Sequence, residues 1–105
     1  MDGKQAKQLG RLLEVARQDS EVLAAILFGS AVRSQQTSRS DLDVCLILMP
    51  RTKPYESIAL SRKRLEYLRQ FDLDVQIFQQ LPLYIRRRVL KEGKVQFVRD
   101  EDLLY

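Results

Sequence analysis

Two short groups of residues in this sequence have the types and spacing that chemistry at a phosphate group requires. The first is Gly29-Ser30, which directly follows an apolar run ending at Phe28. Glycine lets the backbone approach a ligand closely, and the serine adds one hydroxyl and one N–H group. The second is Asp41-Leu42-Asp43, which opens another apolar run. We therefore expect a phosphate-holding turn beside a pair of carboxylates.

The spacing of Asp41 and Asp43 favours metal binding. Residues two apart on a strand face the same side, so both carboxylates can reach one metal ion or a pair of ions. Mg²⁺ prefers one or two carboxylates together with phosphate oxygens and water. The alternative is that Asp41 caps a turn and Asp43 is a charge on an edge strand, because Asp is common in turns at strand ends.

Asp74 is the candidate third carboxylate. It lies in the segment 72–78, where apolar and polar residues alternate, so its side chain is expected to face away from the apolar ones. Asp72 shares that face and could take its place, and either residue could instead be a solvent-facing strand position. Three carboxylates from two strands beside a phosphate-holding turn would form the two-metal site that nucleotidyl transfer uses.

The rest of the chain must supply the elements that position these groups. The hydrophobic periodicity predicts helices and strands that alternate along one domain over 1–105, an α/β (α+β) fold with a small mixed sheet of about four strands flanked by helices. Helices are expected over 4–18, 54–70 and 81–92, strands over 22–28, 43–49, 72–78 and 95–98, and a tail over 100–105. A short helix over 31–33 is also expected.

Two basic segments have more than one interpretation. In the helix over 54–70, the spacing predicts a buried face of Ile58, Leu60 or Ser61, Leu65 and Leu68, with Arg62, Lys63, Arg64 and Glu66 solvated. Arg86-Arg87-Arg88 with Lys91 is either a solvated helix face or a surface for RNA, an acidic protein or ATP phosphates.

Composition narrows the chemistry. The chain has 18 basic and 14 acidic residues and no histidine, which removes the usual neutral-pH base and the zinc sites that depend on histidine. Cys45 is the single cysteine and lies in an apolar run, so we expect a core residue in a reducing, cytoplasmic setting. No apolar run approaches the roughly 20 residues of a membrane-spanning helix, and no membrane partner is expected.

The motif resembles that of a known superfamily. Gly29-Ser30, ten residues, and then Asp41-x-Asp43 is similar to the signature of the DNA polymerase β-like nucleotidyltransferases. Within that superfamily the chain resembles the minimal nucleotidyltransferases, which are single-domain proteins of about this size. Further residues agree with that subgroup: Arg33, Ser40, Asp74 and the run Leu90-x-Glu92-Gly93-x-Val95. Ser34 stands where the family commonly has glycine.

The resemblance implies an activity and a partner. It implies a polymerase β-like core that transfers AMP from ATP to a tyrosine of a small helical HEPN-type ribonuclease toxin, which makes the chain an antitoxin. The implied nucleotide-binding residues are Gly29, Ser30, Arg33 and Ser40, and the implied catalytic residues, which would also bind two Mg²⁺ ions, are Asp41, Asp43 and Asp74. Two alternatives stay open: a catalytically silent antitoxin of the same fold, and a nucleic-acid-binding module.

Overall fold

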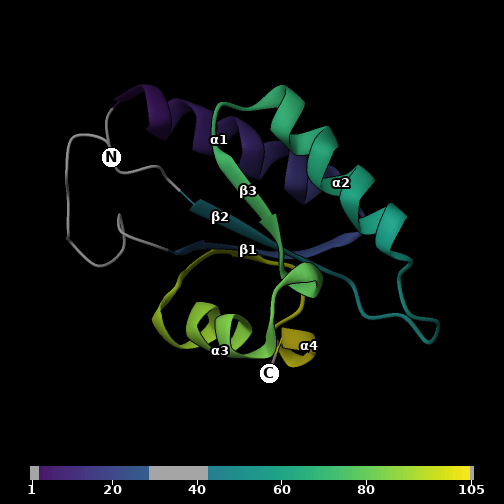
Figure 1. Cartoon of the computed structure of the whole chain (residues 1–105). Coiled ribbons are helices and arrows are strands. Elements are labelled where there is room, and N and C mark those ends of the chain that lie inside the picture. Colours follow the sequence, from purple (N-terminus) through teal and green to yellow (C-terminus); the bar gives the residue numbers. More distant parts are fainter. Residues whose placement is uncertain (1–2, 29–42, 105) are drawn as a thin grey trace.

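The computed structural model describes residues 3–28 and 43–104, and these form one four-stranded sheet with helices on both sides (Figure 1). The elements in chain order are α1 (Gly3–Gln18), β1 (Val22–Phe28), β2 (Asp43–Leu48), α2 (Ser57–Gln70), β3 (Asp74–Ile77), the 3₁₀ turn η1 (Phe78–Gln80), α3 (Leu83–Glu92), β4 (Lys94–Val98) and α4 (Glu101–Leu104). The predicted helix over 31–33 lies outside the described residues.

The sheet is mixed, as the sequence predicted. Its strand order is β3-β2-β1-β4, so the two longest strands lie in the centre. β1 pairs antiparallel with both β2 and β4, whereas β2 and β3 run parallel. The parallel pair is connected through α2, because parallel neighbours need a crossover of a dozen or more residues. The parallel strands β2 and β3 therefore begin at the same end of the sheet.

Both faces of the sheet are covered. α1 and α2 lie on one face and α3 and α4 on the other (Figure 1). Alternate residues of β1 and β2 enter two separate apolar clusters: Val44 and Leu46 join the cluster with α1 and α2, while Cys45 and Ile47 join the cluster with Val89 of α3. Burial on both faces explains why these strands read as continuous apolar runs.

The buried face of α2 differs from the predicted one. Ile58 and Leu65 are 59% and 49% exposed, whereas the sequence analysis placed them in the core. The buried residues of this helix are Leu60, Lys63 and Tyr67, with Lys63 only 8% exposed instead of solvated. Leu60 is buried and Leu68 packs against the core, as predicted. The helical period was therefore correct, and the buried face is rotated away from Ile58 and Leu65 toward Lys63 and Tyr67.

A charged cluster explains the burial of Lys63. Its Nζ lies 3.0 Å from Asp19 Oδ2 and 3.0 Å from Glu21 Oε1, two carboxylates in the connection between α1 and β1. The Tyr67 hydroxyl donates to Asp19 Oδ2 at 2.9 Å. A buried charge is tolerated when it is paired and hydrogen-bonded, so this cluster lets α2 bury a lysine against the end of α1.

Two further segments differ in length or type from the expectation. β3 begins at Asp74, not at residue 72, and ends at Ile77, where the chain enters η1. Residues 101–104, expected in a tail, form the short helix α4. Just before it, Arg99 donates from Nη2 to Arg17 O at 2.9 Å and to Asp19 O at 3.1 Å. This side chain therefore satisfies backbone carbonyls at the end of α1.

Among the described residues, no helix is long and apolar enough to cross a bilayer. This agrees with the short apolar runs of the sequence.

Candidate active site

Two of the three predicted carboxylates come together at one end of the sheet. Asp43 is the first residue of β2 and Asp74 is the first residue of β3, and the two are Cα partners in the parallel pairing. Neighbouring strands lie about 4.8 Å apart, so residues separated by 31 positions in sequence become lateral neighbours. Both side chains are partly exposed.

Both carboxylates belong to the α3 face of the sheet. Asp43 follows the same alternation as Cys45 and Ile47, which pack with Val89 of α3. Asp74 alternates with Val75 and Ile77, which belong to the cluster on the opposite face. Successive strand residues point to opposite faces, so Asp43 and Asp74 project from the same side of adjacent strands.

The end of β1 lies beside this pair. Phe28, the last residue of β1 and the one that precedes Gly29-Ser30 in the sequence, is the Cα partner of Asp43. The row across this end of the sheet is therefore Phe28, Asp43 and Asp74. In the sequence, Gly29 of the predicted phosphate-holding turn comes directly after Phe28 and lies outside the described residues.

Asp74 is held by two neighbouring side chains. Gln76 Nε2 donates to Asp74 Oδ1 at 3.0 Å, and Arg64 Nη2 lies 3.8 Å from the same oxygen. Arg64 also donates from Nε to the Val75 carbonyl at 2.8 Å. The alternative Asp72 is exposed and precedes β3, and its backbone N–H donates to Gln8 Oε1 at 3.3 Å. Of these two aspartates, only Asp74 is in register with Asp43.

The other predicted site residues, Gly29, Ser30, Arg33, Ser40 and Asp41, lie outside the described residues. Within the described ranges no group of three His, Cys, Asp or Glu residues could hold a metal ion. The described part of the candidate site is therefore the pair Asp43 and Asp74. Carboxylate oxygens are hard ligands that suit Mg²⁺, and the pair supplies two of the three carboxylates in the predicted set.

Cys45 does not contribute reactive chemistry beside Asp43. It is fully buried, and burial raises the pKa of its thiol to about 12. The thiol therefore stays protonated at neutral pH, and the thiolate is the nucleophilic form. This confirms the prediction that Cys45 is a core residue.

The basic cluster on α3 is divided between structural and solvated side chains. Arg86 donates to the carbonyls of Leu81 and Gln79, each at 2.8 Å, which ties α3 to η1. Arg87, Arg88 and Lys91 are exposed. Three of the four residues are thus on the surface, which fits both a solvated helix face and a binding surface, whereas Arg86 is part of the structure of the turn.

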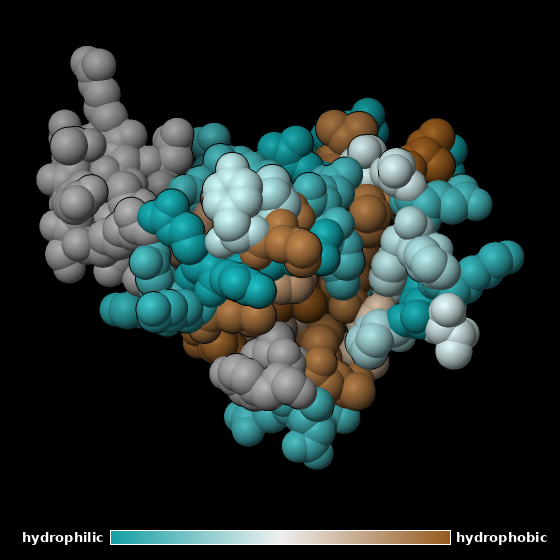
Figure 2. Space-filling model, turned by 60° about the horizontal axis from the view of Figure 1, so that its bottom comes forward, coloured by the Kyte–Doolittle hydropathy of each residue, from teal (hydrophilic) through white to brown (hydrophobic). Residues whose placement is uncertain are grey.

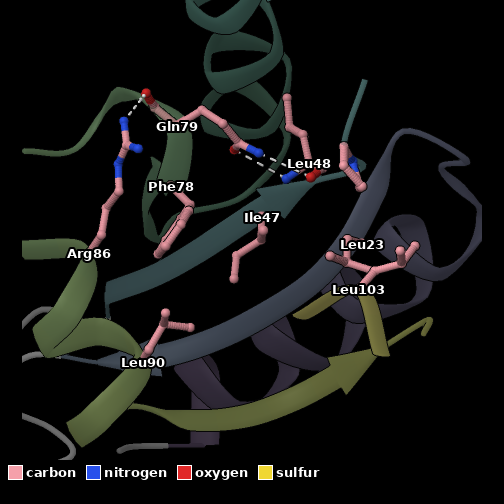
Figure 3. Close-up of a pocket in the computed structure, with 9 residues that line it drawn as sticks. Leu23, Ile47, Leu48, Phe78, Gln79, Arg86, Leu90 and Leu103 are labelled. Atoms are coloured by element: carbon pink, nitrogen blue, oxygen red, sulfur yellow. Dashed lines mark hydrogen bonds between the residues drawn. The ribbon is translucent and has the colours of Figure 1, made fainter. Parts of the chain in front are cut away.

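A cavity of about 250 Å³ lies on the same face of the sheet as the carboxylates, near the far end of β2. Figure 2 shows apolar residues gathered around a hollow on this side of the molecule. Residues that line the cavity include Leu23, Ile47, Phe78, Leu90 and Leu103 (Figure 3). Ile47 is four residues along β2 from Asp43, or about 13 Å, so the cavity is separate from the carboxylate pair.

The polar groups of this cavity bind one another. Gln79 Nε2 donates to Leu48 O at 3.0 Å and Gln79 Oε1 accepts from Leu48 N at 3.2 Å, while Arg86 binds Gln79 O (Figure 3). These interactions occupy the groups that would otherwise recognise a polar ligand. The cavity is an apolar hollow between α3, α4 and the sheet.

Two side chains contact Asp74, and the sequence indicated only one of them, Gln76, whereas Arg64 was missed. Gln76 is two residues after Asp74, and the alternation of 72–78 already placed it on the same face. Arg64 had no comparable signal, because its contact with Asp74 depends on how α2 packs beside β3. The sequence analysis described it only as a solvated residue of the helix.

Solved structures share this fold. A toxin–antitoxin solved with AMP-PNP aligns with a TM-score of 0.60 at 19% identity, covering 91% of this chain and 75% of that chain. A mutant of the MntA-HpeT toxin–antitoxin aligns with a TM-score of 0.62 at 20% identity, covering 90% and 75%. A candidate nucleotidyltransferase from Sulfolobus solfataricus aligns with a TM-score of 0.60 at 16% identity, covering 90% and 81%. At these identities the similarity establishes the fold.

Sequence comparisons add a relative and a family. The chain is 36% identical over 78 residues to the candidate protein adenylyltransferase MJ1547 of Methanocaldococcus jannaschii. This alignment covers 74% of this chain. The chain spans 57% of that relative's length. The family described as polymerase beta, nucleotidyltransferase matches residues 11–102, a range that contains the whole predicted motif and both in-register aspartates. This chain therefore belongs to the polymerase β nucleotidyltransferase family.

Proposed function

We propose that this chain transfers AMP from ATP to a tyrosine hydroxyl of a partner protein and thereby acts as the antitoxin to a small helical HEPN-type ribonuclease toxin. The observation that carries the proposal is the in-register pair Asp43 and Asp74 at the end of β1. Family membership supports nucleotidyl transfer, and the likeness to MJ1547 supports a protein acceptor. The toxin–antitoxin neighbours, one solved with AMP-PNP, support the partner and the nucleotide.

In the proposed reaction, the acceptor oxygen forms a bond to the α-phosphorus of ATP. The bond from that phosphorus to the bridging oxygen of the β-phosphate breaks, and pyrophosphate leaves. In this proposal Asp74 would accept the hydroxyl proton, and Gly29 and Ser30 would hold the phosphates. Asp41, Asp43 and Asp74 would bind Mg²⁺, which lowers the pKa of an attacking hydroxyl and stabilises the leaving oxygens.

The expected kind of acceptor follows from the architecture of the described residues. The described residues use both faces of the sheet for their own helices. Positioning of the reacting groups supplies much of the rate enhancement in such transfers. We therefore expect the acceptor to provide its own docking surface, as a folded toxin can.

The test is a labelling assay with α-labelled ATP and Mg²⁺, performed on the protein alone and with lysate of its native host. We expect a labelled protein band with wild type. Asp43→Asn and Asp74→Asn are expected to reduce labelling by at least about 100-fold, the scale seen when one group that stabilises transition-state charge is removed. Asp72→Asn is the matched control, because Asp72 is an exposed carboxylate two residues from Asp74, and it should retain labelling.

Other outcomes contradict the proposal in different ways. A labelled RNA band would assign a nucleic-acid acceptor. Loss of labelling in Asp72→Asn but not in Asp74→Asn would exchange the roles of these two residues. A wild-type protein that binds and silences its partner without any labelling would be the catalytically silent antitoxin.

A further inference from the structure

Arg64 closes part of the open edge of the sheet. β3 is an outer strand, and outer strands leave a row of backbone groups without a neighbouring strand. The Val75 carbonyl of this strand accepts a hydrogen bond from Arg64 Nε at 2.8 Å. A side chain of α2, which covers the opposite face from the carboxylates, therefore reaches to the edge strand that carries Asp74.

The same guanidinium group of Arg64 also forms an ion pair with Asp74. Its Nη2 lies 3.8 Å from Asp74 Oδ1. A guanidinium is a rigid planar fork, so the bond from Nε to a backbone carbonyl fixes where the other nitrogens lie. Arg64 thus contacts Asp74 from an anchored position, unlike a lysine or arginine whose head group moves freely in solvent.

Gln76 strengthens the same orientation. Its Nε2 donates to Asp74 Oδ1 at 3.0 Å. The hydrogen bond from Gln76 and the ion pair with Arg64 therefore reach the same oxygen of the Asp74 carboxylate. A carboxylate can accept at both oxygens, so this arrangement directs Oδ2 to other ligands.

The contribution of Arg64 to stability is expected to be small. Its side chain is 38% exposed and that of Asp74 is 41% exposed. Ion pairs this exposed contribute about 0–1 kcal/mol, because solvent screens them. The main consequence of the contact is therefore the orientation of the Asp74 carboxylate.

We propose that Arg64 is a positioning residue that, anchored on the Val75 carbonyl, holds Asp74 by Oδ1 so that the other carboxylate oxygen serves the catalytic site. The inference rests on the proposed function, in which Asp74 is a catalytic carboxylate. It adds a residue of α2 to the described part of the site, which otherwise consists of the first residues of β2 and β3.

The test compares Arg64→Lys with Arg62→Lys, the same change at an exposed position of the same helix. Lysine keeps the charge but cannot bind the Val75 carbonyl and Asp74 together. We expect R64K to lower kcat for AMP transfer and to weaken Mn²⁺ binding, measured by electron paramagnetic resonance, each by about 10–100-fold, the usual cost of removing a partner of a metal ligand. The KM for ATP and the melting temperature should stay at the wild-type values, and R62K should change nothing.

Either loss in R64K without a loss of folded protein supports the proposal. Wild-type kcat together with wild-type Mn²⁺ affinity would overturn it, and so would a kcat loss fully explained by unfolding. If the wild-type protein transfers no AMP, the proposed function fails, and Mn²⁺ binding still decides the role of Arg64. In that case R64K must bind Mn²⁺ more weakly than R62K, and equal binding would contradict the inference.

Discussion

Lys63 shows that a lysine expected in solvent can be buried when the fold places carboxylates beside its ammonium group. On an isolated helix a lysine between apolar positions is solvated. Here the connection from α1 to β1 places Asp19 and Glu21 within 3.0 Å of its Nζ. The two carboxylates and the Tyr67 hydroxyl make a cluster that joins α2 to the end of α1. Leaving one charge of such a cluster without its partner is costly.

The titration of this cluster predicts a pH window of stability. Burial favours a higher pKa for Asp19, but hydrogen bonds from Lys63, the Glu21 amide and Tyr67 outweigh it and hold the pKa below 3.8. The stability that Asp19 contributes to the fold is therefore fully present above pH 3.8. It is lost as the pH falls through the lower pKa of the folded state. Burial alone would lower the pKa of Lys63, yet Glu21 and Asp19 raise it above 10.5, so that contribution is lost as the pH rises beyond 10.5.

We expect the free energy of unfolding, measured with urea at several pH values, to fall on both sides of this window. Asp19→Asn should cost on the order of 2 kcal/mol at pH 7, less than for a fully buried pair because Glu21 still faces Lys63. It should also flatten the acid side of the profile. An unchanged acid side in Asp19→Asn would show that other carboxyl groups control acid unfolding.

At the scale of elements, the junction between α3 and β4 depends on a close approach. α3 ends where Gly93 donates its N–H to Val89 O at 2.9 Å, and β4 begins at the next residue. A Cβ at Gly93 would collide with the Ile26 side chain and with the Val89 carbonyl, and would lie 3.1 Å from Leu27 O. The glycine is therefore required by packing of the junction against β1, since its backbone φ of −73° suits any residue.

Gly93→Ala is therefore expected to destabilise the fold by about 1–3 kcal/mol, the usual cost of overpacking a filled core. Gly10→Ala is the matched control. Gly10 lies on the exposed side of α1 with nothing within 4 Å of its added Cβ, so alanine should stabilise the helix by about 0.5–1 kcal/mol. Urea unfolding of both variants measures the difference, and a neutral Gly93→Ala would contradict the close approach.

At the scale of the whole molecule, burial is concentrated in the two central strands. β1 and β2 pair with each other and each has a further strand beside it. Helices cover both of their faces, and each residue from Val22 to Leu27 and from Val44 to Leu48 is buried. The candidate carboxylates lie at the end of this buried centre and are partly exposed, so a ligand can reach them.

Native-state hydrogen exchange should follow this arrangement. Amides of β1 and β2 are expected to exchange only through global unfolding, whereas those of β4, whose residues are exposed or partly buried, should exchange through smaller openings. Mass spectrometry of peptides that cover each strand measures this order. Equal protection of β4 and β1 would show that the sheet opens as one unit.

The sequence by itself determined much of this protein. Apolar runs and alternation located each of the four strands in the described part of the chain. Burial on one or two faces of a sheet leaves a sequence pattern that can be recognised without knowing the neighbouring strand. The spacing of Gly29-Ser30 and Asp41-x-Asp43 pointed to the family, since a phosphate-holding turn and paired carboxylates are close together in the chain. The roles of the residues in 29–42 remain predictions, because the structure describes none of them.

Only the tertiary structure decided which distant residues meet. Asp72 and Asp74 were equivalent by alternation, and the start of β3 brought Asp74 into register with Asp43. Ile58 and Leu65 looked like core residues of α2, but the charges of Asp19 and Glu21 turned Lys63 inward instead. Arg64 reached Asp74 by the same packing. The periodicity of apolar residues identifies a segment as helix or strand. Which face of that element is buried depends on partners that are far away in the sequence.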